Sequence, residues 1–177
     1  MIQNRPFTVT YTLMNENSIL NIDLLNGWRI VNDDVMGGVS NGNIMPSDNG
    51  MIVFSGEISL QFGGGFSSLR SPVFERNWND FRGVQLICKG DGRTYQISLK
   101  DSPFHTRRYF IHPFLTEAGK WEEIYLPFDE FQRKEFNTLK GNTGGIPLEA
   151  VYEISVTLAD KKAGPFELQI YSISLIR

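Results

Sequence analysis

Apolar and polar residues alternate along most of this chain, which is the pattern of β-strands that bury one face. In the last run the alternation changes phase near Tyr171 and Ser172. One extra residue would return the apolar side chains to the same face, so we predict a β-bulge there. Helical periodicity is limited to single turns at 128–131 and 148–152, and residues 17–25 fit either structure. The alternating runs are residues 7–13, 54–62, 95–99, 124–128, 154–158 and 166–175.

Turn sequences rich in glycine, asparagine and aspartate separate these runs. Asp91-Gly92 stands between residues 84–89 and 93–100 and predicts a β-hairpin. Residues 160–162 predict a second, solvated hairpin turn, and residues 134–147 predict a mobile loop. Many short strands with alternating faces indicate an all-β fold, an antiparallel β-sandwich or jelly roll. We expect one such domain over residues 1–177.

Charge and composition exclude several kinds of protein. The 177 residues carry 17 Lys and Arg against 20 Asp and Glu, a net charge of -3, which argues against a nucleic-acid partner. One Cys and two His exclude an internal disulfide, a multi-Cys metal site and a three-His metal centre. No apolar run reaches the roughly 18 residues of a membrane span, so we predict no membrane insertion. The first residues do not resemble a signal peptide, and we expect a cytoplasmic protein.

Candidate catalytic and metal-binding patterns have simpler interpretations. Residues 38–42 match G-x-S-x-G around Ser40, but the Gly, Asn and Pro that follow do not begin the helix that a nucleophile elbow needs. Asn32-Asp33-Asp34 could bind a hard cation such as Ca²⁺, or could satisfy backbone N–H groups in a turn, which we favour. Cys88 and His112 are expected in the core. The aromatic residues Trp28, Trp78, Trp121 and Tyr109 could form a sugar-stacking platform, although core packing is the commoner role.

One block carries a resemblance to a known family. Residues 28–40, W-R-I-V-N-D-D-V-M-G-G-V-S, resemble the opening motif of the complex I intermediate-associated protein 30 family, W-x-x-V-N-D-G-V-M-G-G-x-S. Asp34 and Phe62-Gly63 depart from the family pattern, which has Gly and Asn-Asn there. Further similar blocks occur in the family's order, so that the resemblance covers most of residues 28–175. They lie at residues 64–70, 90–95, 121–131 and 159–168.

The resemblance implies a galactose-binding-domain-like jelly roll and a role in assembling complex I or a photosystem. The expected partners are then subunits of a respiratory or photosynthetic complex, and the chain resembles a stand-alone bacterial-type member of the family. Within the motif, Gly37-Gly38 would allow a tight turn, and Met36 would be a core plug or an exposed contact. As a hypothesis, Asp33 pairs with Arg70, because both lie in matched blocks and carry opposite charges.

We therefore expect a non-enzymatic protein-interaction or assembly module. The alternative is a small-ligand or carbohydrate-binding module, in which Trp78 or Tyr109 lies exposed beside Arg107 or Asp101. An enzyme that uses Ser40 and a histidine is a third possibility. No catalytic residue, metal ligand or cofactor is predicted. The residues predicted to bind or to build the motif are Trp28, Asn32, Asp33, Met36, Gly37, Gly38, Ser40, Phe66, Arg70 and Tyr109.

Overall fold

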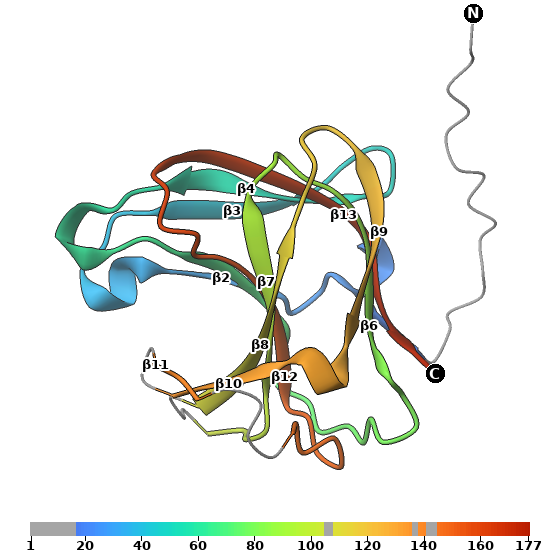
Figure 1. Ribbon diagram of the computed structural model, residues 1–177. Helices are drawn as coiled ribbons and strands as arrows, with labels where there is room; N and C mark the ends of the chain where they lie inside the picture. The colour runs from blue at the N-terminus through green and yellow to red at the C-terminus, as the bar shows by residue number, and fades with distance from the viewer. Residues whose placement is uncertain (1–16, 105–107, 136–137, 141–144) are drawn as a thin grey trace, which may run out of the picture.

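Two antiparallel sheets pack face to face in the computed structural model, which describes residues 17–104, 108–135, 138–140 and 145–177 (Figure 1). The first sheet has the order β3-β4-β13-β6-β9, and β1 also pairs with β13. Its strands are β1 (Ser18–Leu20), β3 (Asn41–Pro46), β4 (Ile52–Ile58), β6 (Gly83–Lys89), β9 (Trp121–Pro127) and β13 (Gly164–Ile176).

The second sheet has seven strands in the order β11-β10-β8-β7-β12-β5-β2. They are β2 (Arg29–Asn32), β5 (Ser67–Arg70), β7 (Thr94–Lys100), β8 (Arg108–Leu115), β10 (Gln132–Glu135), β11 (Thr138–Leu139) and β12 (Glu153–Leu158). Four short 3-10 helices connect strands, namely η1 (Ile22–Leu24), η2 (Asp33–Met36), η3 (Gln61–Gly63) and η4 (Phe128–Glu130). In the described part of the chain, no helix is long and apolar enough to span a bilayer.

The core lies between the sheets and is made by the alternating apolar residues. On β7, for example, Tyr95, Ile97 and Leu99 point inward and are at most 1% exposed, because every second side chain of a strand lies on one face. The phase change in β13 is confirmed, since its pairing with β6 shifts register between Ile170 and Ser172. This bulge keeps Ile173 buried together with Ile170. The prediction of an all-β sandwich is therefore confirmed.

The predicted hairpin at Asp91-Gly92 is wrong, although its two strands are present. β6 belongs to the first sheet and β7 to the second, so the turn carries the chain from one sheet to the other. The Asp91 carboxylate shapes this corner by accepting hydrogen bonds from the N–H of Arg93 at 3.0 Å and of Glu167 at 2.9 Å. A short turn sequence shows where the chain reverses, but it does not show which strand the next one joins.

The turn at 160–162 is also a crossing between sheets, from β12 to β13, and its aspartate is not solvated. The Asp160 side chain is only 5% exposed and pairs with Arg93 at 2.6 Å. Arg93 also donates to the carbonyl oxygens of Gly164 and Pro165, both at 3.1 Å. The sequence gives no local signal for this ion pair, because its two residues come from different turns.

The remaining element predictions have mixed outcomes. Residues 128–131 form the predicted turn as η4, whereas residues 148–152 do not form a helix, because Val151 pairs with Arg76 in an isolated β-bridge. Residues 17–25 contain β1 and η1, and the expected loop at 134–147 contains part of β10 and all of β11. Cys88 is buried as expected. The strand predicted at 7–13 lies outside the described residues.

Candidate functional site

Asp33, in the family-like motif, holds two loops together. It opens η2 and is completely buried. Its Oδ1 accepts a hydrogen bond from the Ser40 N–H at 2.9 Å, and its Oδ2 accepts one from the Ser40 hydroxyl at 2.5 Å. Oδ2 also accepts from the N–H groups of Gly65 at 2.6 Å and Phe66 at 3.3 Å, on the loop that follows η3. We call this arrangement the Asp33 lock.

The glycines of the motif make room for the lock. Gly37 ends η2 with φ 85°, a left-handed conformation that favours glycine. A Cβ atom at Gly38 would overlap the Asp33 carboxyl group, and one at Gly64 would also contact it too closely. Beside the lock, Asn32 Oδ1 accepts from the Gly42 N–H at 3.1 Å and from the Ser67 hydroxyl at 2.8 Å, which ties β2 and β5 to β3 of the other sheet.

These contacts confirm the interpretation of this segment as a turn that satisfies backbone N–H groups. Burial raises the pKa of the Asp33 carboxyl, but the hydrogen bonds from Ser40, Gly65 and Phe66 outweigh it, and the pKa lies below its usual value. Among the described residues, no group of three or more His, Cys, Asp or Glu is placed to hold a metal ion.

Ser40 belongs to the lock as well. Its hydroxyl donates to Asp33 and accepts from the Ser59 N–H at 3.0 Å. It is followed by β3 instead of a helix, so the strand–turn–helix context of a nucleophile elbow is absent here. The geometry therefore gives Ser40 a structural role.

The hypothesis that Asp33 pairs with Arg70 is wrong. Asp33 is saturated by Ser40 and the loop after η3, whereas Arg70 lies at the end of β5 and donates from Nε to the Ser68 hydroxyl at 3.3 Å. The acidic group that faces Arg70 is Glu153, from β12. Opposite charge in two matched blocks could not decide between these carboxylates, because strand register sets which side chains meet.

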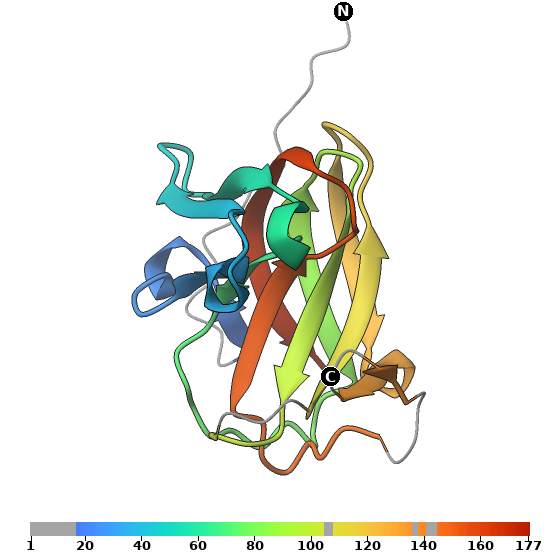
Figure 2. The same cartoon turned by 90° about the vertical axis from the view of Figure 1, so that its left-hand side faces the viewer.

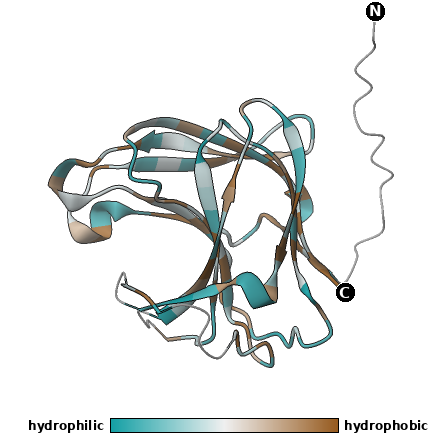
Figure 3. Cartoon of the chain, in the orientation of Figure 1, coloured by the Kyte–Doolittle hydropathy of each residue, from teal (hydrophilic) through white to brown (hydrophobic). Residues whose placement is uncertain are grey.

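The loops joined by the Asp33 lock expose apolar side chains. In Figure 1, η2 and η3 lie next to each other at the left-hand edge, and they are again neighbours in Figure 2. Figure 3 colours parts of these loops tan to brown, which marks hydrophobic residues. We call these five residues the apolar patch, and they are Val35 (70% exposed), Met36 (59%), Val39 (53%), Leu60 (46%) and Phe62 (75%).

Phe62 has an unusual backbone for a bulky residue. Its φ is 55° and its ψ is 25°, the left-handed region that side chains other than glycine seldom adopt. Its ring points into solvent, so core packing does not compensate the strain. Met36, for which we expected a core plug or an exposed contact, is exposed.

The aromatic residues considered for sugar stacking are split between core and surface. Trp78 is 1% exposed, so it cannot be the exposed aromatic of a binding face. Trp28 is half-buried and packs against the core, and Trp121 is also half-buried. Tyr109 is half-buried on β8, with the Lys134 ammonium 5.7 Å from its ring centre.

The outer face of the second sheet is the other polar surface of interest. Figure 2 looks onto this face, with β12, β7 and β8 in the foreground. A row across it joins Arg70, Ser155, Ser98 and Ile111, which are neighbours on adjacent strands. Ile111 is 8% exposed yet does not belong to the core cluster, as expected for a residue on the outer side.

Glu153 is the buried charge of this outer face. It accepts from Arg29 at 2.8 Å and from Lys100 at 2.9 Å, and its side chain is 4% exposed. Burial raises the pKa of Glu153, but hydrogen bonds and charges from Lys100 and Arg29 outweigh it and lower the pKa. Burial lowers the pKa of Arg70, Glu153 opposes this change, and Arg29 adds to it.

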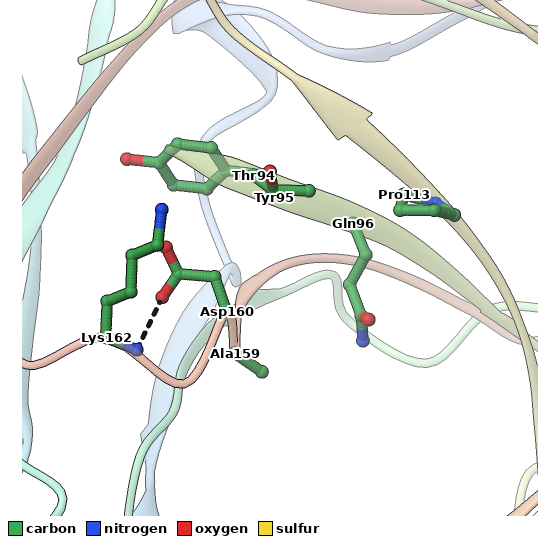
Figure 4. Close-up of a pocket in the computed structure, with 7 residues that line it drawn as sticks. All are labelled: Thr94, Tyr95, Gln96, Pro113, Ala159, Asp160 and Lys162. Atoms are coloured by element: carbon green, nitrogen blue, oxygen red, sulfur yellow. Dashed lines mark hydrogen bonds between the residues drawn. The ribbon is translucent and has the colours of Figure 1, made fainter. Parts of the chain in front are cut away.

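The pocket in Figure 4 lies at the end of the outer face that is farther from Glu153. The pocket has a volume of about 300 Å³. It lies between Gln96 and Pro113 of the sheet and the turn that connects β12 to β13. There the Lys162 N–H donates to Asp160 Oδ1 at 3.2 Å. We call Glu153 with Arg29, Lys100 and Arg70 the Glu153 cluster, and it lies at the other end of the polar outer face from the pocket.

The structure brings most of the predicted motif residues together at the Asp33 lock and places Arg70 and Tyr109 on the outer face. The sequence did not single out Glu153, Arg29 or Lys100 as a cluster. No local signal reveals it, because the three residues come from three strands of the sheet.

Comparison with known proteins identifies relatives over most of the chain. A profile of the complex I intermediate-associated protein 30 family matches residues 17–170. The mitochondrial protein of that name from Mus musculus is 28% identical over 166 residues, which is 82% of this chain and 51% of the relative. A probable member from Caenorhabditis elegans, also mitochondrial, is 32% identical over 164 residues, 81% of this chain and 48% of the relative. The chain thus spans about half the length of the curated relatives it matches.

Solved structures with a similar fold are carbohydrate-binding modules and agarases. The family 11 carbohydrate-binding module from Clostridium thermocellum, in complex with a β-1,3-1,4-mixed-linked tetrasaccharide, matches with a TM-score of 0.67 and 15% identity over 90% of this chain and 94% of the module. An exo-β-agarase matches with a TM-score of 0.56 and 9% identity over 91% of this chain and 25% of the enzyme. The jelly-roll, galactose-binding-like architecture is confirmed.

Proposed function

We propose that this chain, which belongs to the complex I intermediate-associated protein 30 family, is a non-enzymatic protein-interaction domain that binds a respiratory-complex subunit during assembly. The names of the curated relatives associate those proteins with complex I intermediates. Those relatives are mitochondrial, and a cytoplasmic location stays a prediction for this chain. The five exposed side chains of the apolar patch carry this proposal.

The apolar patch has the properties of a preformed contact surface. Val35 and Met36 lie inside the family-like motif, and Phe62 lies in η3, directly before the loop that the Asp33 lock fastens to it. Clustered exposed apolar side chains on a folded protein mark contact sites. Because the lock fixes both loops, a partner would not bear the entropy cost of ordering them.

The chemistry of the motif supports binding instead of catalysis. The Ser40 hydroxyl donates to a buried carboxylate, and that carboxylate is occupied by donors from the two loops. Asp33 is within reach of the Ser40 proton, but its lowered pKa makes it a weak base. The motif therefore has the contacts of a loop brace.

Affinity capture from the native host tests the proposal. The tagged chain is expected to retain subunits of a respiratory complex, identified by mass spectrometry. The double variant Met36→Ser with Phe62→Gly removes two side chains of the apolar patch and is expected to lose this capture. Leu115→Ser is the matched control. Leu115 is similarly exposed, at 67%, but lies on β8, outside the apolar patch. Equal capture by the wild type and the double variant would refute the proposal.

A second candidate function is small-ligand or carbohydrate binding on the outer face of the second sheet. The observation that favours it is the polar row around Arg70, Ser155 and Ser98 with Tyr109 close by. Titration with neutral and acidic sugars tests this candidate independently of any protein partner.

A further inference from the structure

The Glu153 cluster contains more positive than negative charge. Arg29, Arg70 and Lys100 all lie near the single carboxylate of Glu153. Arg108 and Arg133, on β8 and β10 of the same sheet, have acidic partners of their own, Asp101 and Glu135. Among the described residues, the cluster therefore holds three positive charges and one negative charge, in a chain whose net charge is -3.

Arg70 is the cation of the cluster that remains available. Arg29 uses Nη2 for Glu153 and Nη1 for the Ser71 carbonyl at 2.7 Å, and Lys100 holds the other Glu153 oxygen. Arg70 donates only from Nε, to Ser68, so both its Nη groups are without a partner among the described residues. A half-buried guanidinium with two parallel free donors has the geometry that binds a carboxylate at two points.

The surroundings of Arg70 suit hydroxyl groups. Ser155 and Ser98 follow it in the row across the sheet, and both are less than 9% exposed, so they form a floor below the longer side chains. Tyr109 is close enough to raise the pKa of Arg70, and Gln96 donates to the Ser98 hydroxyl at 3.4 Å. Hydroxyl and amide groups of this kind can both donate to and accept from a polyhydroxylated ligand.

We propose that the outer face of the second sheet is a site for a small hydroxylated carboxylate such as a sugar acid, with Arg70 binding the carboxylate. Glu153 positions the site, because it holds Arg29 and Lys100 in place and leaves Arg70 free. The hydroxyl groups of the ligand lie over Ser98 and Ser155, towards Tyr109. This inference rests on the second candidate function and names the chemical class of its ligand.

Nuclear magnetic resonance titration of the full chain tests the site. Sodium glucuronate is the probe, and glucose is its neutral counterpart with the same ring. Glucuronate is expected to shift the Nε–H signal of Arg70 and the backbone signals of Ser98 and Ser155 in a saturable way, and glucose at least about tenfold more weakly. Added NaCl is expected to weaken the glucuronate binding, because the site recognises charge.

Arg70→Gln is expected to lower the glucuronate affinity about tenfold or more, since it removes the charged donor pair. Arg82→Gln is the matched control on an exposed arginine of another surface and is expected to change nothing. The NMR spectrum of each variant, compared with that of the wild type before titration, shows whether the variant remains folded. Cyclohexanecarboxylate carries one carboxylate on a six-membered ring without the sugar hydroxyls and is expected to bind more weakly than glucuronate.

Several outcomes would overturn the inference. Equal binding of glucose and glucuronate would leave sugar binding intact but remove the acidic site. Equal binding of cyclohexanecarboxylate and glucuronate would remove the role of the hydroxylated floor. If neither sugar shifts these signals, the acidic site and the second candidate function both fail for these probes. The protein-interaction proposal is tested separately by the apolar-patch variants.

Discussion

Replacing Asp33 is expected to destabilise the whole protein, because the Asp33 lock joins two loops and both sheets meet beside it. In Asp33→Ala the N–H groups of Ser40, Gly65 and Phe66 lose their acceptor, and the Ser40 hydroxyl loses its shorter one and keeps the Ser59 carbonyl at 3.2 Å. A buried donor left without a partner costs about 1–3 kcal/mol, and water entering the new space recovers part of this. We therefore expect a loss of about 3–5 kcal/mol in the free energy of unfolding.

Asp33→Asn is expected to be almost as harmful. One oxygen is kept, but an NH₂ group now faces donors such as the Gly65 N–H, which cannot accept from it. For a chain of this size, each kcal/mol corresponds to about 2–4 °C in Tm. Both variants should therefore melt roughly 6–20 °C below the wild type.

Urea denaturation followed by circular dichroism measures this effect. Asp34→Ala is the matched control, since the Asp34 side chain is exposed and its loss should cost no more than about 0.5 kcal/mol. If Asp33→Ala is within about 1 kcal/mol of Asp34→Ala, the lock does not stabilise the fold as the contacts suggest.

The pH dependence gives a second measure of the same lock. Folding lowers the pKa of Asp33, so its contribution is fully present above its ordinary unfolded pKa of about 3.9 and is lost as the pH falls through the lower folded pKa. The pKa values of Glu153 and Asp160 are also lowered, so their contributions to the free energy of unfolding are likewise lost as the pH falls. The difference between wild type and Asp33→Asn isolates Asp33 and is expected to shrink below about pH 4. A constant difference down to pH 2.5 would contradict the assignment.

Three further predictions address other features. Phe62→Gly should leave stability unchanged or raise it by about 1 kcal/mol, because glycine adopts the left-handed backbone of this residue without strain; a marked loss in urea denaturation would mean that the ring supports the fold. Arg93→Ala should cost about 3–5 kcal/mol in the same assay, since it leaves Asp160 buried without its partner, whereas Arg82→Ala should cost little. Cys88 should not react with a thiol reagent in the native state at pH 8 but should react in urea, because burial raises the pKa of its thiol to about 12; rapid native labelling would contradict its burial.

The sequence by itself determined the inward face of each strand and the position of the bulge in β13. The alternating pattern determined which side chains of a strand face inward, as at Tyr95, Ile97 and Leu99, and the phase change located the bulge before Ser172. It could do so because the side-chain period of a strand is a local property of the backbone. The acidic motif and its glycines likewise indicated a tight turn with satisfied N–H groups.

Only the tertiary structure decided which strands and side chains meet. It assigned β6 and β7 to different sheets, joined Arg93 to Asp160, and placed Glu153 instead of Asp33 opposite Arg70. It also left Met36 and Phe62 exposed, in the neighbouring helices η2 and η3, and buried Trp78 in the core. The physical reason is that strand pairing and register join residues far apart in the chain, and a period of two residues specifies a face without specifying the neighbour across it.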